Sequence, residues 1–261
     1  MSDFWVGLLL VGTVVASLAY LVALKAKLMA IVDLIWTAGL GISGIAYYFA
    51  QEVPHARATF VVIILGLWSF RLSYHLLKDR VLRGHEDPRY ANLDAHWGAA
   101  SRRNFYFLFL AQIVFIAIFL YPVTIAAGNP AGGGRVADVL GILIALSALV
   151  GESIADRQLA AFRAKPENKG AVCRQGLWRY SRHPNYFFEW LHWWAYVAFA
   201  WGAANWWLSL IGPAAMYIFL RYLTGIPHAE RSSLKNRGEA YRNYQQTTSA
   251  FFPWRPHEPQ S

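Results

Sequence analysis

Charged residues are scarce in this sequence. Only 15% of the 261 residues are Asp, Glu, Lys or Arg, whereas a soluble domain usually carries about a quarter. Hydrophobic residues make up 56% of the chain, and the mean hydropathy is +0.29. So few charges cannot cover a soluble surface, and the composition therefore predicts a protein that lies in lipid. The 12 Trp, 14 Tyr and 16 Phe agree, because amphipathic aromatic side chains gather at bilayer interfaces.

The sequence also lacks the patterns of several common binding sites. A single cysteine, Cys173, excludes an internal disulfide and a cysteine-built metal site. His75, His85 and His183 lack the HExxH type of spacing, so no metal is predicted. Neither GxGxxG nor a P-loop is present, so a nucleotide would need a site unlike that of a soluble dinucleotide fold. No cleavable signal peptide is expected, because the first apolar run, 4–24, lacks a basic leader and is long enough to span.

What the chain has instead is a series of long apolar stretches. Seven of them approach the roughly 20 residues needed to cross about 30 Å of hydrocarbon. They are 4–24, 28–50, 59–78, 105–127, 137–160, 185–203 and 205–222. Their uniformly apolar character favours helices over barrel strands, which alternate. The sequence predicts an all-α membrane protein, a bundle of about seven transmembrane helices forming a single integral membrane domain over 1–261.

The basic residues are unevenly distributed between the loops. The formal net charge is +9, and the lysines and arginines gather after the first, third and fifth spans and in the tail. Loops rich in Lys and Arg stay in the cytoplasm, so we expect the N-terminus outside and the C-terminus in the cytoplasm. This bias accounts for the charge without nucleic acid. We expect a multi-pass integral membrane protein, surrounded by lipids, with no nucleic acid and no obligate protein partner.

Several polar side chains lie inside the predicted spans, where a charge costs several kcal/mol by insertion scales. They are Asp33 in the second span, Arg71, Tyr74 and His75 in the third, Glu152 and Asp156 in the fifth, Asn185, Glu189 and His192 in the sixth, and Arg221 in the seventh. Two interpretations stay open: these groups pair with one another and lock the bundle, or they line a polar cavity. Nearly all of them lie at the cytoplasmic ends of their spans, which favours a cavity for the set.

Three segments outside the spans carry side chains suited to a nucleotide. Arginine forks onto phosphate oxygens, and carboxylates accept hydrogen bonds from ribose or adenine. The run Arg-His-Pro-x-Tyr adds an imidazole, a phenol and a helix N-terminus, which suit a phosphate or carboxylate group. The candidates are Arg83, Asp87, Arg89 and Tyr90 in the third loop, Arg182, His183 and Tyr186 in the fifth, and Glu230, Tyr241 and Tyr244 in the tail. The tail either lies on the membrane as an amphipathic helix or folds back as a lid.

From about Glu152 to Trp254 the chain resembles the C-terminal domain of the steroid 5α-reductase family, especially its bacterial relatives. The matching marks are Asp156-Arg157-Gln158-Leu159, Gly176-Leu177-Trp178, Ser181-Arg182-His183-Pro184-Asn185-Tyr186 with Glu189, Gly225-Ile226-Pro227 with Glu230, Tyr241, Tyr244 and Phe251-Phe252-Pro253-Trp254. The resemblance implies a seven-helix bundle in the bacterial inner membrane that holds NADPH in a cytoplasm-facing cavity. It also implies hydride transfer to the C=C bond of a lipophilic α,β-unsaturated ketone, such as a 3-oxo-4-ene steroid.

The same resemblance implies roles for individual residues and a division of the chain. By motif position, the expected cofactor contacts are Asp156, Arg163, Asn185 and Arg221, with Glu189 supporting Asn185 and with Arg71 and Arg89 as further contacts. We expect 1–135 to form the substrate side, 136–255 to be the reductase-like NADPH-binding part, and 256–261 to be a disordered tail.

Catalysis would need a donor at the substrate carbonyl. Hydride addition to an enone builds negative charge on the oxygen, and donors placed there lower the barrier by several kcal/mol. A carboxyl buried in an apolar bundle keeps its proton and can donate. The resemblance implies a carboxyl and a tyrosine, and for these we predict Asp33 with Tyr74 or His75 as the catalytic residues. A steroid, a polyprenyl aldehyde, a long-chain enone and a quinone-like molecule all stay open as substrates.

Two other classes of function compete with the reductase. Arg-His-Pro-x-Tyr followed by Glu230, Leu234, Gly238, Tyr241 and Tyr244 is similar to isoprenylcysteine and phospholipid methyltransferases, which bind S-adenosylmethionine. Asn185 inside the motif and Glu189 after it are reductase-like. A transporter or sensor would use the buried polar groups as an ion path, but these groups gather at one membrane face and inverted repeats are absent.

Overall fold

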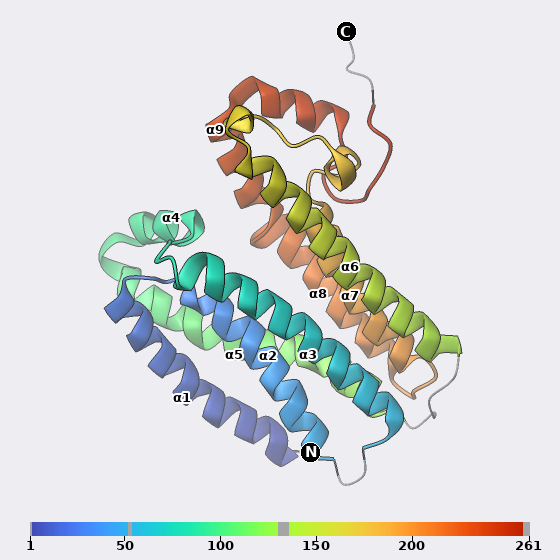
Figure 1. Ribbon diagram of the computed structural model, residues 1–261. Helices are drawn as coiled ribbons and strands as arrows, with labels where there is room; N and C mark the ends of the chain where they lie inside the picture. The colour runs from blue at the N-terminus through green and yellow to red at the C-terminus, as the bar shows by residue number, and fades with distance from the viewer. Residues whose placement is uncertain (1, 52–53, 130–135, 258–261) are drawn as a thin grey trace. The chain divides into compact units, whose positions relative to one another are not determined.

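The described part of the chain is mainly helical. The computed structural model describes residues 2–51, 54–129 and 136–257, and within these ranges it contains helices and no strand (Figure 1). The helices are α1 (Ser2–Ala26), α2 (Ile31–Phe49), α3 (Ala56–Leu76), α4 (Pro88–Trp97), α5 (Ser101–Ala127), α6 (Val136–Ala164), α7 (Pro184–Ala200), α8 (Ile211–Ile218) and α9 (Ile226–Thr247). The predicted all-α class is therefore confirmed for this part of the chain.

The predicted spans correspond closely to helices, with one difference at the end. Within the described ranges, six helices are long and apolar enough to cross a membrane. Helix α7 has 17 residues and would reach about 26 Å at 1.5 Å per residue, slightly less than the hydrocarbon core. The last predicted span is not one regular helix, because a 3₁₀ segment (Trp206–Leu210) precedes α8 and a π-helical segment (Phe219–Leu223) follows it. A multi-pass membrane protein is confirmed at this coarser level.

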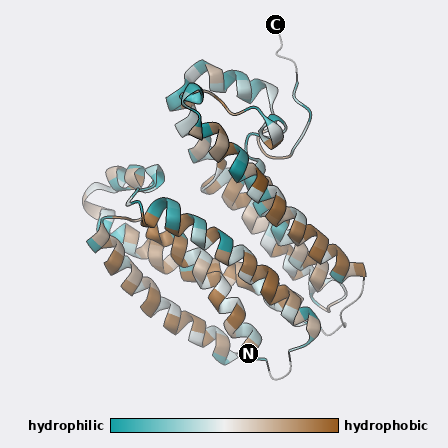
Figure 2. Cartoon of the chain, viewed as in Figure 1, coloured by the Kyte–Doolittle hydropathy of each residue, from teal (hydrophilic) through white to brown (hydrophobic). Residues whose placement is uncertain are grey.

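The hydropathy of the residues separates the long helices from the short polar ones (Figure 2). The long helices are mostly apolar, whereas α4 and α9 carry many hydrophilic residues. On the long helices, large apolar side chains such as Leu10, Phe70 and Val136 are exposed. In water such a surface would be unfavourable, and in a bilayer it faces acyl chains. The exposed apolar faces therefore agree with the shortage of charged residues.

The chain divides into two compact units. The first contains Met1–Arg135 and Phe199–Ile211, and the second contains Val136–Ala198 and Gly212–Ser261. In the first unit α2 packs on α3, and both pack on α5, with α1 alongside (Figure 1). The ring of Trp36 lies edge-to-face on those of Trp68 and Phe119, with centroids 5.7 and 5.5 Å away.

In the second unit α6, α7 and α8 lie side by side, and α9 follows them (Figure 1). Gly151 on α6 lies against the ring of Phe188 on α7, where any Cβ would overlap the ring. The Trp190 indole donates to the carbonyl oxygen of Pro213 at 3.0 Å, which links α7 to α8. Helix α9 is kinked at Gly238, whose φ of 51° and ψ of −125° are unfavourable for residues with a side chain.

Two polar helices lie outside the apolar stretches. Helix α4 falls within the predicted third loop and has clear start signals, because Asp87 caps the backbone N–H of Arg89 at 2.8 Å and Pro88 follows it. Most of the tail forms helix α9. After it, 248–257 turns back, and the Trp254 N–H donates to the carbonyl oxygen of Tyr180 at 2.9 Å. Of the tail expected to be disordered, 256–257 are described and 258–261 lie outside the described residues.

Candidate functional site

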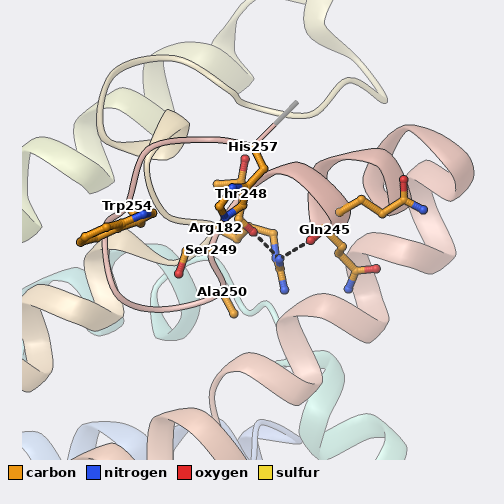
Figure 3. A pocket seen from close by; sticks show the side chains of 8 residues that line it. Arg182, Gln245, Thr248, Ser249, Ala250, Trp254 and His257 are labelled. Carbon is orange, nitrogen blue, oxygen red and sulfur yellow. Dashed lines mark hydrogen bonds between the residues drawn. The ribbon is translucent and has the colours of Figure 1, made fainter. Parts of the chain in front are cut away.

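The tail of the second unit is held by Arg182. Its backbone N–H donates to the carbonyl oxygen of Ser249 at 2.8 Å. Its Nε donates to Glu230 Oε1 at 2.7 Å, and its Nη1 donates to the carbonyl oxygens of Gln245 at 2.9 Å and Thr248 at 2.5 Å (Figure 3). We call these five residues the loop–tail clamp. Because Arg182 already bonds to four protein groups, this geometry does not support the phosphate contact predicted for it.

A buried histidine lies beside Glu230 of the clamp. His183 Nε2 lies 3.4 Å from Glu230 Oε1, and Gln245 donates to Glu230 Oε2 at 2.9 Å. The His183 ring stacks on Tyr186 with the planes 7° apart. Burial lowers the pKa of the His183 imidazole below its ordinary value, Glu230 opposes this shift, and Arg182 adds to it. The imidazole is therefore neutral at pH 7 and does not offer a positive charge to a phosphate.

The two predicted tyrosines of the tail belong to the same packing. Tyr241 and Tyr244 are buried, with ring centroids 5.8 Å apart. The Tyr244 hydroxyl donates to the carbonyl oxygens of Trp178 and Ser181. Tyr244 therefore joins α9 to the loop before α7, and Tyr241 packs beside it. The structure thus gives them a structural role, whereas the sequence predicted cofactor contacts.

An open pocket of about 380 Å³ borders the clamp (Figure 3). It is lined by Arg182, Gln245, Gln246, Thr248, Ser249, Ala250, Trp254 and His257. Its wall contains no lysine and no arginine other than Arg182, whose guanidinium already binds protein groups. The pocket is therefore poorly suited to the phosphates of a dinucleotide.

A second polar group joins the end of α6 to the start of α7. The Asn185 amide donates to Asp156 Oδ1 at 3.3 Å. Asn185 Oδ1 is buried and accepts no hydrogen bond from the described residues. Such an acceptor normally has a donor, so this atom indicates a missing partner. One turn further into α7, the Glu189 side chain is buried.

Two further predicted cations lie in the same unit. Arg163, at the end of α6, is exposed. The guanidinium of Arg221, in the π-helical segment after α8, lies 5.3 Å from the ring centroid of Tyr222. Neither arginine is as deeply buried as Arg182. Both therefore stay candidates for binding an anionic group.

In the first unit, the predicted residues form an ion network around Asp33. Asp33 Oδ2 lies 2.6 Å from both Arg80 Nη1 and Arg89 Nη2, and Tyr90 donates to Oδ1 at 2.5 Å. Asp87 Oδ2 lies 3.0 Å from the same two guanidinium nitrogens. Burial alone would raise the pKa of the Asp87 carboxyl, but Arg89 and Arg80 bring it below its usual value. Asp33, Asp87, Arg89 and Tyr90 thus bind one another, in agreement with the locking interpretation.

The loop that carries Asp87 is also fixed to the start of α2. Glu86 accepts hydrogen bonds from the backbone N–H groups of Met29 and Ala30, the latter at 2.9 Å. A carboxylate at a helix N-terminus satisfies donors that have no partner within the helix. Glu86 therefore holds the third loop against α2.

The three predicted catalytic residues do not converge. Tyr74 is 54% exposed and stacks on Phe70 at the outer face of α3. His75 Nδ1 lies 3.3 Å from Asp79, which is also 3.8 Å from the exposed Arg83. Asp33 is contacted instead by Arg80, within the π-helical turn Leu77–Val81, and by Arg89 after it. The described residues show no contact of Asp33 with Tyr74 or His75, and their catalytic role stays a prediction. Arg71, one turn before His75, is partly buried.

Comparison with known proteins shows to which protein family the chain belongs. Residues 19–248 match the family described as "Protein of unknown function (DUF1295)". The chain belongs to the DUF1295 family. This family is related to steroid 5α-reductase-like membrane proteins. The DUF1295 chain is also 25% identical over 287 residues to the uncharacterized protein C594.04c of Schizosaccharomyces pombe, an alignment covering 97% of this chain and 80% of the relative. No solved structure matches significantly.

Sequence reasoning missed several members of these groups in the DUF1295 chain. Arg80 was not predicted as a partner of Asp33, because nothing in the sequence marks the π-helical turn that places it there. Gln245 and Thr248 join the clamp partly through their carbonyl oxygens, which leave no trace in side-chain patterns. Among the described residues no cluster of three or more metal-binding side chains occurs. The prediction of no metal stays a prediction.

Proposed function

We propose that the protein is an NADPH-dependent membrane reductase that acts on the C=C bond of a lipophilic α,β-unsaturated ketone. Its family is related to steroid 5α-reductase-like membrane proteins, and its apolar helices suit a substrate that dissolves in lipid. The observation that carries the proposal is the buried Asn185 Oδ1, which has no donor among the described residues. It lies beside Asp156, where α6 ends and α7 begins.

The residues present fit parts of this cofactor. The carboxamide and ribose hydroxyls of NADPH are donors, and Asn185 Oδ1 and the Asp156 carboxylate are acceptors. Arg163 and Arg221 are cations that suit its phosphates, because one guanidinium group can donate two parallel hydrogen bonds to two phosphate oxygens. When bound, the cofactor supplies the hydride.

The other groups have supporting roles in this proposal. The loop–tail clamp holds the segment that leads into α7, and thereby fixes the position of Asn185. Both Asp33 oxygens already accept hydrogen bonds, from two guanidinium groups and a phenol, so we no longer propose Asp33 as the donor to the substrate carbonyl.

A binding experiment tests the proposal. The protein purified in mild detergent is heated with NADPH, NADH or S-adenosylmethionine. A ligand that binds only the folded state at about 100 times its Kd stabilises it by roughly 2.7 kcal/mol. We expect a Tm increase with NADPH that is lost in Asn185→Ala. Tyr180→Phe, which changes an exposed side chain of the same unit, is the matched control and should keep the increase.

Each alternative outcome has a definite meaning. A Tm increase with S-adenosylmethionine alone would replace the reductase with a methyltransferase. An NADPH-induced increase that survives Asn185→Ala would remove Asn185 from the cofactor site. No response to any of the three ligands would refute the cofactor proposal. A positive binding result leads to turnover assays with progesterone and trans-3-nonen-2-one, followed by loss of absorbance at 340 nm.

A further inference from the structure

The segment 251–254, which follows the polar helix α9, carries three aromatic side chains. It reads Phe-Phe-Pro-Trp, and neither the clamp nor the proposed cofactor site uses its rings. We call it the aromatic segment. Phe251 is 3% exposed, whereas Phe252 is 47% exposed and Trp254 is 68% exposed. The segment therefore has one ring that packs inside the unit and two that face outward.

The buried ring holds the aromatic segment against two apolar helices. The centroid of the Phe251 ring lies 5.8 Å from that of Trp190 on α7 and 5.3 Å from that of Tyr217 on α8. The Ser181 hydroxyl, in the loop before α7, donates to the carbonyl oxygen of Phe251 at 2.9 Å. After the polar helix α9, the chain thus returns to α7 and α8.

The level of this contact along α7 places it in the outer part of a bilayer leaflet. Phe187 and Trp190 follow the first residue of α7 by three and six residues, which is about 4.5 and 9 Å along the axis. Because α7 is slightly shorter than the hydrocarbon core is thick, its first two turns lie among the outer parts of the acyl chains. The Phe252 ring lies 6.2 Å from Phe187 and 5.4 Å from Trp190, and therefore lies at the same level.

The exposed ring of Phe252 continues the exposed apolar surface of the α8 region. Tyr222 and Leu223, at the end of the π-helical segment, are exposed. The Tyr217 ring lies between those of Tyr222 and Phe252, with centroids 6.0 and 6.1 Å away. Exposed apolar residues that occur singly are common, but a contiguous group of them marks an interaction site.

The outer end of the aromatic segment is bordered by cations. Trp254 is followed directly by the exposed Arg255. The Trp254 N–H bonds to Tyr180, which precedes the start of α7, and the exposed Arg179 comes directly before Tyr180. Amphipathic aromatic rings favour the headgroup level of a bilayer, and guanidinium groups bind phosphate oxygens. An indole beside two exposed arginines therefore fits phospholipid headgroups.

Packing within the unit explains only part of the aromatic segment. It accounts for Phe251, which fills space between α7 and α8. It does not require Phe252 and Trp254, whose exposed rings would be unfavourable in water. Contact with lipid accounts for all three rings.

We propose that the aromatic segment is an interfacial anchor. Phe252 inserts among the outer acyl chains beside α8, and Trp254 lies among the phospholipid headgroups. The anchor does not depend on the proposed function. It is joined to the loop–tail clamp, because the Arg182 N–H donates to the carbonyl oxygen of Ser249, two residues before the segment. Contact with lipid thus helps to hold the tail on the loop that leads into α7.

Nitroxide depth measurements on the full chain in phosphatidylcholine nanodiscs test the anchor. A label at Trp254→Cys is compared with one at Leu10→Cys, on an exposed apolar face of α1, and one at Glu239→Cys, on the polar helix α9. The native Cys173 is buried, so a brief reaction labels the introduced cysteine.

The readout is the ratio of collisions with dissolved oxygen to collisions with a nickel chelate. Oxygen concentrates among acyl chains and the chelate stays in water, so this ratio rises with depth. We expect the ratio at Trp254→Cys to exceed that at Glu239→Cys and to approach that at Leu10→Cys. A ratio no higher than at Glu239→Cys would place the segment in water. That result would overturn the anchor and leave a protein as the partner of this surface.

A second variant tests which side chain holds the segment in the lipid. Phe252→Ser removes an exposed ring and keeps the buried Phe251, and it should lower the ratio at the Trp254→Cys label. Gln246→Ser, which changes an exposed polar side chain before the segment, is the matched control and should leave the ratio unchanged. An unchanged ratio in Phe252→Ser would overturn the anchoring role of Phe252. The first measurement keeps Phe252 intact, so it decides the proposal even if this variant does not fold.

Discussion

At the scale of single residues, the buried charged groups described above mostly form ion pairs and hydrogen bonds with other protein groups. Arg182 binds Glu230 and two carbonyl oxygens, and Asp33 binds Arg80 and Arg89. A charge that is removed from water is stable only when such partners surround it. Removing one partner therefore costs more than the pair contributes, because the other charge stays behind without compensation.

We expect Glu230→Gln to destabilise the second unit. The change keeps the size of the side chain but removes the negative charge beside Arg182, whose side chain is only 10% exposed. Breaking such a pair costs about 3 kcal/mol. The Tm should fall by several degrees, and proteolysis should cut within 248–257 more rapidly. The matched control is Glu239→Gln, because Glu239 pairs with Arg242 at a site where both side chains are more than 60% exposed. That pair is worth less than about 1 kcal/mol, so equal effects of the two variants would contradict the clamp.

The stability of this unit should also depend on pH through His183. Its pKa is lowered in the folded protein by burial, so the unfolded chain binds a proton first as the pH falls. Stability is therefore full above an unfolded pKa of about 6.5 and decreases as the pH falls from there toward the lower folded pKa. Thermal unfolding between pH 8 and pH 5 should show this decrease. His183→Gln should flatten the profile, and an unchanged profile would mean that another group causes the decrease.

At the scale of helices, close packing depends on positions without a side chain. Gly151 faces the Phe188 ring, and Gly41 and Gly44 on α2 face Ser69 and Leu65 on α3. Small residues allow helices in membranes to approach each other closely. In the second unit, the Gly151 contact sets the distance between α6 and α7, and therefore the distance between Asp156 and Asn185.

Gly151→Ala should separate α6 from α7. The added methyl group overlaps the Phe188 ring, and overpacking of this kind costs about 1–3 kcal/mol. We expect a lower Tm and a weaker thermal response to NADPH. Gly7→Ala in α1 is the matched control, because nothing lies within 4 Å of its added Cβ and alanine stabilises a helix by up to about 1 kcal/mol. A loss of stability in Gly7→Ala and none in Gly151→Ala would show that this contact is unimportant.

The helices could be predicted because their main determinant is local. Long apolar runs mark spans regardless of what packs against them, so α1, α2, α3, α5 and α6 were found from the sequence. The hydropathy pattern predicts a loop where α4 lies, although Asp87 followed by Pro88 is a helix-start signal. The breaks around α8 were missed because they leave no pattern in hydropathy.

The site was harder to predict, because it depends on contacts between distant residues. The i,i+4 spacing predicts that Arg71 and His75 lie on one face of their helix. It cannot show whether that face of the helix lies against Asp33. Arg182 and Tyr244 were chosen for their chemistry, and the structure uses that chemistry to bind backbone carbonyl oxygens. Asn185 and Asp156 were placed together only by the fold.

At the scale of the whole molecule, the distribution of charge predicts an orientation in the membrane. Basic residues occupy alternate loops and the tail, so we expect the C-terminus to lie in the cytoplasm. A C-terminal fusion to green fluorescent protein should therefore fluoresce in bacteria, and a fusion to alkaline phosphatase at the same place should be inactive. A dark fluorescent fusion together with an active phosphatase would reverse the orientation. Fusions after Gly128 provide the control, with the opposite pattern expected.

The loop–tail clamp has a consequence for synthesis on the ribosome. Arg182 and Thr248, which it joins, are 66 residues apart. At 5–20 residues per second, translation needs about 3–13 s to produce the second after the first. Throughout that interval the arginine has emerged without the carbonyl oxygens and the backbone of 245–249 that will surround it. The second unit therefore cannot finish folding helix by helix as it enters the membrane, and the newly made loop has to wait, exposed to water and to proteases, for a segment that is translated seconds later.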